Sequence, residues 1–501
     1  MDLLFEIGIE LAAKGSRRTA ETLYQQLKAA IIEGRLKPGA RLPATRQAES
    51  CFGVSRNTAA EIYDRLLLDG YLVSRRGAGT FVADSVPAAQ PVSPIGVPAP
   101  ERRLNPFWLR PDITASMGFW QDAPRDSGPT ARGLDFRPAL IDSRLFPFET
   151  FRKATAKQLR SLETRPASFR SAQGNQGNHA LREAVTRHIA LTRGVACRAE
   201  DVVVTSGAQQ GFDLLARILV TPGETMVAVE DPGYPPMRVA FAAAGARIVP
   251  VGVDGEGLIV EQLPPDAGII CVCPSHQFPL GVSMSPRRRQ ALLDFARRHG
   301  AVIVEDDYDG EFRYQGSPLE ALRTARNGDV VFYVGTFSKC MLPALRLGFI
   351  VAPGWALGTL VAAKNCLDWH CATPLQLGVA EFIAGGHLAR HVRKMRQFYR
   401  KRRATLLEGL RHGLAPWLQP IPSSYGMHVA ALATPGVELE AAVARLGQEG
   451  VKLHTLRRYY LGAEPANGLV FGYGAVDPAE IARGLASLRQ VLADRVHQRR
   501  L

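Results

Sequence analysis

The strongest constraint on the fold is an alternation, from residue 133 onward, between short apolar segments and longer stretches with helical periodicity. The apolar segments are rich in Val and Ile: Val202–Thr205, Met226–Val229, Ile269–Val272, Ala301–Val304 and Val330–Val334. Helical patterns lie between them, as in Gln209–Leu219 and Pro286–His299. Buried strands that alternate with helices predict an α/β domain with a mostly parallel sheet covered by helices.

The chain divides into three zones by composition. Its 501 residues exceed one ordinary domain, and a hydrophobic content of 46% is enough for a large core. Residues 85–132 contain nine prolines, which prevent regular helices and central strands and therefore predict an extended linker. We expect this linker to join a domain at residues 19–84 to a domain at residues 133–501.

The first zone has the pattern of a small DNA-binding domain. Apolar spacing, capping residues and glycines predict three helices and then two strands: Ala20–Glu33, Thr45–Phe52, a helix capped by Ser55 and ended by Gly70, Tyr71–Ser74 and Thr80–Ala83. This order is that of a helix-turn-helix followed by a hairpin wing. A recognition helix enters the major groove by its N-terminal end, and wing arginines can lie along the phosphate backbone.

The charge balance is compatible with a polyanionic partner, since Lys and Arg outnumber Asp and Glu by 61 to 47. From periodicity alone, a small helical domain with ordinary surface arginines explains the zone equally well. Its motifs Leu42–Arg46, Gly53–Thr58 and Arg76–Val82 resemble the GntR-family winged helix. The resemblance implies contacts with double-stranded DNA by Arg46, Arg56, Asn57, Thr58, Arg76 and Gly77.

Four motifs in the third zone each follow a predicted strand, where open α/β sheets bind ligands. They are Ser206–Gln210, Glu230–Tyr234, Val304–Tyr308 and Gly335–Lys339, the last followed by Arg346. A lysine here can react with an aldehyde, a carboxylate can pair with a pyridinium nitrogen, and a helix N-terminus can bind phosphate. Taken alone, each motif is better explained by an ordinary feature: a plain strand-to-helix turn, a surface turn tyrosine, a loop with solvated acids or a solvated lysine.

Together the motifs resemble those of fold-type I aminotransferases, which bind pyridoxal 5'-phosphate, and the whole chain resembles the MocR subfamily of GntR regulators. This implies that Lys339 forms the internal aldimine, Asp306 pairs with the pyridine nitrogen, Tyr308 contacts the phenolic oxygen and Tyr234 stacks on the ring. The phosphate would be held by Ala208, Gln209, Thr336, Ser338 and Arg346, and His276 would line the pocket.

The sequence also departs from working aminotransferases. Phe278 stands where they carry the Asn of an Asn-Pro-Thr-Gly turn, and Asn467–Phe471 lacks their arginine for the substrate carboxylate. Arg457 and Arg458 are candidates to replace that arginine at the effector. We therefore assign no catalytic residue and expect a regulator that senses an amino compound, or pyridoxal phosphate itself. The alternative is an active aminotransferase with an accessory winged helix.

The remaining sequence features concern the cysteines, the cellular location, pairing of chains and one basic segment. Cys271 and Cys273 belong to an apolar strand, which favours buried thiols over a metal site or disulfide. Neither a signal peptide nor a run of 18 apolar residues is present, so we expect a cytoplasmic protein without a membrane partner. Fold-type I domains usually pair, which implies a homodimer. The basic run Arg390–Arg403 is either a second phosphate-contacting surface or a solvated helix face.

Overall fold

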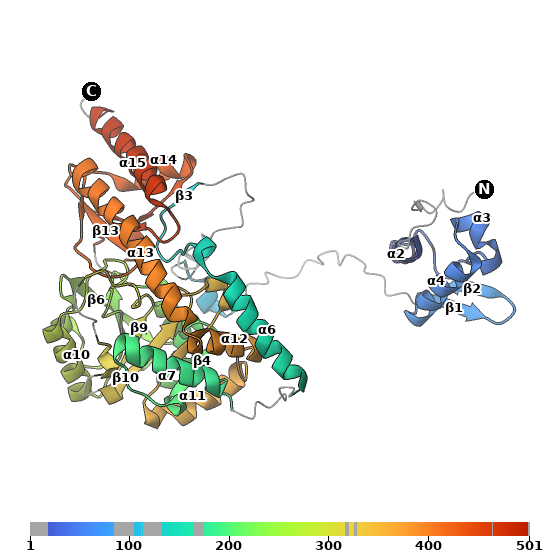
Figure 1. The fold of residues 1–501 in the computed structure, drawn as a ribbon, viewed down its shortest axis with the longest axis horizontal. Coiled ribbons are helices and arrows are strands. Elements are labelled where there is room, and N and C mark those ends of the chain that lie inside the picture. Colours follow the sequence, from blue (N-terminus) through green and yellow to red (C-terminus); the bar gives the residue numbers. More distant parts are fainter. Residues whose placement is uncertain are drawn as a thin grey trace. The chain divides into compact units, whose positions relative to one another are not determined.

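The computed structural model describes residues 19–84, 105–111, 113, 133–164, 174–315, 320–324, 328–462 and 464–498. The chain forms two compact units, Met1–Leu104 and Asn105–Leu501, which are shown in Figure 1. The division falls inside the segment predicted as a linker, most of which lies outside the described residues. Within that segment, Pro106–Leu109 forms a short 3-10 turn.

The N-terminal unit is a winged helix-turn-helix. Its elements follow the predicted order: α2 (Thr19–Ile32), a 3-10 turn (Thr45–Gln47), α3 (Ala48–Phe52), α4 (Arg56–Leu68), β1 (Leu72–Arg75) and β2 (Gly79–Val82). The predicted second helix is thus split, because only Ala48–Phe52 is α-helical. Ser55 caps α4 by accepting a hydrogen bond from the Thr58 backbone N–H at 3.2 Å. The apolar faces of α2 and α4 pack with β1 and β2 in one small core.

An eight-stranded sheet in strand order β4-β11-β10-β9-β8-β5-β6-β7 organises the large unit. The strands are β4 (Val202–Thr205), β5 (Met226–Asp231), β6 (Arg247–Asp254), β7 (Gly257–Leu258), β8 (Ala267–Val272), β9 (Val302–Asp307), β10 (Val331–Thr336) and β11 (Gly348–Val351). The central pairs from β10 to β6 are parallel, whereas β11 and β7 run antiparallel to their neighbours. The α/β architecture with a mostly parallel sheet is therefore confirmed.

Helices cover both faces of this sheet, because alternate strand residues point to opposite sides. One core joins it to α8 (Ala208–Leu219), α9 (Pro235–Ala243) and α11 (Gly354–Leu367). The cores on the other face include α10 (Pro286–His299), α7 (His179–Arg193) and α12 (Thr373–Ala384). Helix α6 (Phe148–Thr164) packs on α12. In the part of the chain that the structure describes, no helix is long and apolar enough to cross a membrane.

The C-terminal portion adds a second sheet in the order β12-β13-β16-β15. Its strands are β12 (Leu418–Pro420), β13 (His428–Ala433), β15 (His454–Thr455) and β16 (Gly468–Gly472), all antiparallel. Helices α13 (His387–Glu408), α14 (Leu439–Gln448) and α15 (Pro478–Gln498) accompany it, and β14 (Val451–Lys452) pairs with the short β3 (Leu134–Asp135).

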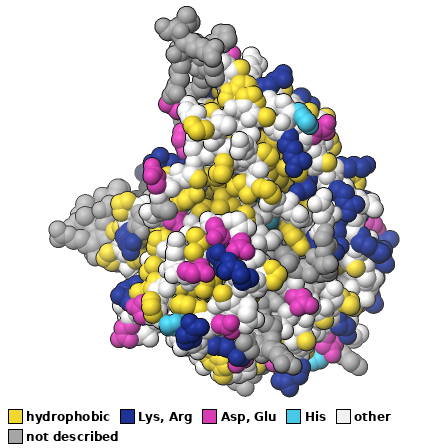
Figure 2. Space-filling model, turned by 90° about the vertical axis from the view of Figure 1, so that its left-hand side faces the viewer, with side chains coloured by type: hydrophobic (Ala, Val, Ile, Leu, Met, Phe, Trp, Pro, Cys, Tyr) yellow, Lys and Arg dark blue, Asp and Glu magenta, His cyan; other side chains and the backbone are white. Residues whose placement is uncertain are grey.

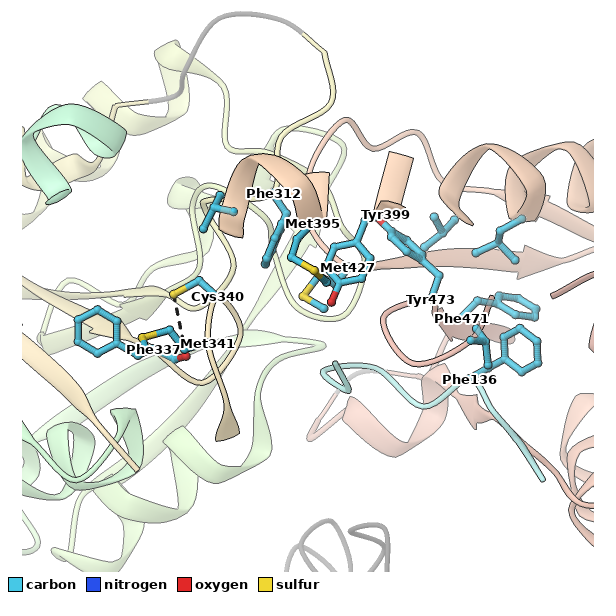
Figure 3. Close-up of a cluster of buried hydrophobic side chains, with 14 of the residues drawn as sticks. Phe136, Phe312, Phe337, Cys340, Met341, Met395, Tyr399, Met427, Phe471 and Tyr473 are labelled. Carbon is cyan, nitrogen blue, oxygen red and sulfur yellow. Dashed lines mark hydrogen bonds between the residues drawn. The ribbon is translucent and has the colours of Figure 1, made fainter. Parts of the chain in front are cut away.

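One continuous hydrophobic core connects the two sheets of the large unit. Figure 3 follows it from Phe337 and Met341, through Met395 on α13, to Phe471 and Phe136 beside the second sheet. All five side chains are at most 3% exposed. Because close-packed cores resist small displacements, this core holds the segments around Phe136 and Phe337 in fixed positions.

The surface of the large unit is mixed in character. Figure 2 shows hydrophobic side chains gathered on the displayed face, with Lys, Arg, Asp and Glu side chains between and around them. Among the described residues, exposed large apolar side chains include Phe148 and Leu159 on α6 and Trp355 on α11. Scattered apolar exposure of this kind is usual for folded proteins.

Candidate functional site

A cavity of about 410 Å³ lies at the ends of the central strands of the large sheet. Nine of the ten residues predicted to bind a cofactor line it: Ala208, Gln209, Tyr234, Asp306, Tyr308, Thr336, Ser338, Lys339 and Arg346. The tenth, His276, is buried beside Tyr308. Strands that are distant in sequence but adjacent in the sheet thus bring these side chains together.

Lys339 is the amine of the cavity. It follows β10, and its neighbours Phe337, Cys340 and Met341 belong to the continuous core drawn in Figure 3. The Lys339 ammonium donates a hydrogen bond to the Ala139 carbonyl at 2.6 Å. Burial lowers the pKa of Lys339 to about 8, so the nucleophilic free amine is far more populated near neutral pH than in an exposed lysine.

Asp306 supplies a carboxylate that is incompletely satisfied. Its Oδ2 accepts a hydrogen bond from Cys273 Sγ at 3.8 Å, whereas its buried Oδ1 has no hydrogen-bond partner. Burial, together with the charges of Asp307 and Asp309, raises the pKa of Asp306 to about 8. A cationic group in the cavity would satisfy the free oxygen and favour the ionised carboxylate.

A further group of lining residues, at the start of helix α8, offers donors that suit an anion. Helix α8 begins at Ala208, directly after Gly207 in the left-handed region with φ 81°. A Cβ at Gly207 would lie 2.9 Å from an Arg346 guanidinium nitrogen, so glycine lets the arginine lie close to the helix N-terminus. The Thr336 and Ser338 hydroxyls are 3.0 Å apart at the same cavity. Backbone N–H groups, a guanidinium and hydroxyls are the donors that phosphate prefers.

Aromatic rings also line the cavity. The Tyr234 and Phe278 rings are 5.5 Å apart and nearly perpendicular. The Phe278 and Tyr308 rings are 5.9 Å apart, also edge to face. A flat heteroaromatic ring can be held between such walls.

Behind Tyr308 lies a buried polar cluster. The Tyr308 hydroxyl donates to the His276 carbonyl at 2.9 Å and lies 2.9 Å from His276 Nδ1. The same Nδ1 is 3.0 Å from Asp309 Oδ2, and the His276 and His428 rings are 4.5 Å apart. His276 therefore orients Tyr308 from behind and does not line the cavity in this structure.

Several lining residues were not predicted from the sequence, notably Arg137, Ala139, Leu140 and His454. They reach the cavity from distant segments because the second sheet and the loop after β3 close over the first sheet. In the structure Ala139 has φ 69°, a conformation that non-glycine residues adopt rarely and often at functional sites, but an alanine in the sequence does not indicate it.

The effector candidates Arg457 and Arg458 lie elsewhere. Both are exposed and line a separate hollow with Glu440, next to His454, which borders both spaces.

In the basic run Arg390–Arg403, Arg402 is buried against Asp142, whereas five cations of α13 are exposed: Arg390, Arg393, Lys394, Arg400 and Lys401.

The predicted DNA-contacting residues gather at the N-terminal end of α4 and at the wing. Arg56 and Asn57 are exposed in the first turn of α4, and Arg46 is exposed in the preceding 3-10 turn. Arg76 and Gly77 are exposed in the turn between β1 and β2. Thr58 is half-buried and its hydroxyl lies 2.9 Å from Ser55 Oγ, so part of its bonding capacity serves the helix cap.

Comparison with known proteins identifies a family for each of the two domains. Residues 19–82 match the gntR family of bacterial regulatory proteins, and residues 141–487 match the family "Aminotransferase class I and II". The chain is 35% identical to the probable rhizopine catabolism regulatory protein MocR of Rhizobium meliloti, over 93% of this chain and 92% of that protein. It is 30% identical to the pyridoxine biosynthesis regulator PdxR of Corynebacterium glutamicum, over 94% and 95%.

Among solved structures, the α-aminoadipate aminotransferase LysN of Thermus thermophilus matches with a TM-score of 0.69 and 26% identity. That match covers 79% of this chain and 99% of LysN. Fold, site and relatives define a transcriptional regulator with a helix-turn-helix and an aminotransferase-like domain. The chain belongs to the MocR-type regulators, which combine a gntR-family domain with an aminotransferase class I and II domain.

Proposed function

We propose that this regulator binds pyridoxal 5'-phosphate in the Lys339 cavity and senses there an amino compound, or the cofactor itself. The observation that supports this most directly is the meeting of three groups in one cavity: the Lys339 amine, the unpartnered Asp306 oxygen and the anion-binding start of α8. When bound, the cofactor would supply an aldehyde carbon that condenses with a primary amine, releasing water, and can later exchange one amine for another.

The described residues fit this group by their chemistry. Asp306 would face the ring nitrogen, because a pyridinium is the cation that its buried free oxygen lacks. Arg346, Thr336, Ser338 and the N–H groups of α8 would hold the phosphate. Tyr234 would stack on the ring. The solved LysN structure is a complex with N-(5'-phosphopyridoxyl)-L-leucine, so a related cavity accepts this class of molecule.

We propose that the N-terminal unit binds a DNA operator through the α4 N-terminus and the wing, with domain limits at residues 19–84 and 133–501. Effector binding would change DNA affinity, which requires that the effector bind two arrangements of the protein unequally. A homodimer would present two winged helices to two half-sites. Phe278, together with the lack of an arginine in Asn467–Phe471, argues against an efficient aminotransferase, because neither offers a charged contact to a substrate carboxylate.

The experiment compares wild type, Lys339→Ala and Lys153→Ala, the last removing an exposed lysine on α6 as a control. Added pyridoxal phosphate should produce a visible absorbance band in wild type and Lys153→Ala but not in Lys339→Ala. Fluorescence anisotropy with the protein's own upstream DNA should then show a cofactor-dependent affinity in the same two proteins. Equal spectra and equal DNA affinities for all three proteins would contradict the proposal.

A further inference from the structure

We infer that the effector of this cavity is a primary amine without a carboxylate group, and that the Asp135–Arg137 ion pair sets this preference. The inference rests on the proposed function and goes further by naming the chemical class of the ligand. It follows from an inventory of the charges that face the cavity.

Among the described lining residues, the lysine and arginine side chains are Arg137, Lys339 and Arg346. Arg346 lies beside the start of α8, where its guanidinium also donates to the Ser206 carbonyl at 3.2 Å. It therefore belongs to the anion-binding end that the cofactor phosphate would occupy. Lys339 is the amine that the effector would have to replace. Arg137 is the remaining candidate to bind a carboxylate.

Arg137 is already neutralised. Its Nε and one terminal nitrogen donate to the two Asp135 oxygens at 2.9 Å and 2.6 Å, and its backbone N–H donates to Asp135 Oδ1 at 3.1 Å. The side chains are only 9% and 20% exposed, so water screens this pair little. A bidentate pair of this kind uses one side of the planar guanidinium and compensates its charge, which weakens its attraction for a ligand carboxylate.

The pair is also held in place by its neighbours. Asp135 belongs to β3, which pairs with β14, and Phe136 between the two partners is buried in the core shown in Figure 3. Moving Arg137 toward a ligand would break the ion pair and leave Asp135 uncompensated in a largely buried position. Removing one partner of a buried pair is strongly unfavourable.

The rest of the cavity disfavours a second anion. Pro138, Leu140, Phe278 and Pro343, which also line the cavity, are apolar and offer no charge to an anion. A ligand carboxylate would lose hydration here without gaining a free cation, which is costly in a water-poor site. An amine with a neutral body avoids this cost and keeps its contacts with the apolar walls.

The test uses matched pairs that differ only in the carboxylate: 2-phenylethylamine against L-phenylalanine, and 3-methylbutylamine against L-leucine. Full-length protein loaded with pyridoxal phosphate is titrated at one pH, and half-saturation is read from the cofactor absorbance per concentration of unprotonated amine. We expect each amine to half-saturate at a concentration at least about tenfold lower than its amino acid, equivalent to about 1.4 kcal/mol. Amino acids that bind as tightly as the amines would overturn the inference.

Asp135→Asn tests the cause. The substitution preserves shape but releases the charge of Arg137, so L-phenylalanine should bind about tenfold more tightly while 2-phenylethylamine changes less than threefold. In Asp135→Asn/Arg137→Gln the gain should disappear. An unchanged ratio between the two ligands in a folded Asp135→Asn protein would overturn the role of the pair, and the wild-type ranking tests the ligand class even if the variant misfolds.

The two levels of the hypothesis fail in different ways. Protein that takes up no cofactor in a Lys339-dependent manner would refute the proposed function itself. Protein that takes up cofactor but prefers amino acids would refute only the inference about the effector.

Discussion

Replacing Asp306 with Asn should have opposite effects on the cofactor-free and the cofactor-loaded protein. In the cofactor-free protein, the Asp306 carboxylate is buried with one oxygen unpartnered and other acids nearby. Asn has almost the same shape and no charge, so it removes this electrostatic penalty. In the loaded protein, the same substitution removes the counter-charge proposed for the pyridinium nitrogen.

The magnitude follows from the pKa, which the fold raises from 3.8 to about 8. The difference of about 4 units, at 1.36 kcal/mol per unit, limits the penalty of the ionised group to about 6 kcal/mol. Burying the asparagine amide costs about 1–3 kcal/mol in return. We therefore expect Asp306→Asn to raise the free energy of unfolding of the cofactor-free protein by about 3 kcal/mol at pH 8.

The pH dependence has a defined sign. Below the unfolded-state pKa of 3.8 the carboxyl is protonated in both states and Asp306 contributes no pH dependence. Between about pH 4 and pH 8 the unfolded state ionises while the folded state keeps the proton, so wild type loses stability as the pH rises. The advantage of Asp306→Asn should grow across this window and become constant above it. Burial raises the pKa of Glu305 to about 7, and this contribution is the same in both proteins, so it cancels in the comparison.

The assay is urea unfolding followed by tryptophan fluorescence, from pH 5 to pH 9, without cofactor. Asp307→Asn is the matched control, because Asp307 Oδ2 accepts from Arg193 Nε and from the Tyr333 hydroxyl, each at 2.5 Å. That variant removes the counter-charge of the buried Arg193 guanidinium and should lose about 3–5 kcal/mol. The reasoning is refuted if Asp306→Asn is no more stable than wild type at pH 8, or if its advantage does not change with pH.

Two further predictions concern function. In DNA-binding titrations, Arg56→Ala should weaken binding by about 1–3 kcal/mol at preferred sequences if Arg56 contacts a base. Arg76→Ala should instead weaken binding to all sequences and lower the slope of log affinity against log salt concentration by about one unit. Binding retained after deletion of residues 1–84 would contradict both predictions. In steady-state assays over a broad panel of amino donors and keto acids, we expect a transamination rate below about 1% of the ~10 per second typical of enzymes. The reason is that misplacing a substrate by about 1 Å can cost a hundredfold in rate. Rapid turnover would support the aminotransferase alternative.

Local sequence determined the elements and the chemistry that follows each strand. The alternation of Val- and Ile-rich segments with helical patterns predicted the parallel core of the large sheet, because strand and helix periodicities are written in short stretches of sequence. The motifs that contain Lys339, Asp306 and the glycine before α8 were expected to meet at one ligand site, and the resemblance to aminotransferases then implied the role of each residue. Each stands at the end of a strand, and the ends of parallel strands meet at one edge of a sheet.

Contacts between distant segments were decided only by the tertiary structure. Arg137 and His454 enter the cavity from the loop after β3 and from β15, whereas Arg457 and Arg458 line another hollow. His276 is buried behind Tyr308 because Asp309 and His428 surround it. The sequence shows that each residue is present but not what surrounds it. Asp306 is buried, and its pKa is raised, only once the two sheets share one core. The same packing shields the Asp135–Arg137 ion pair from water.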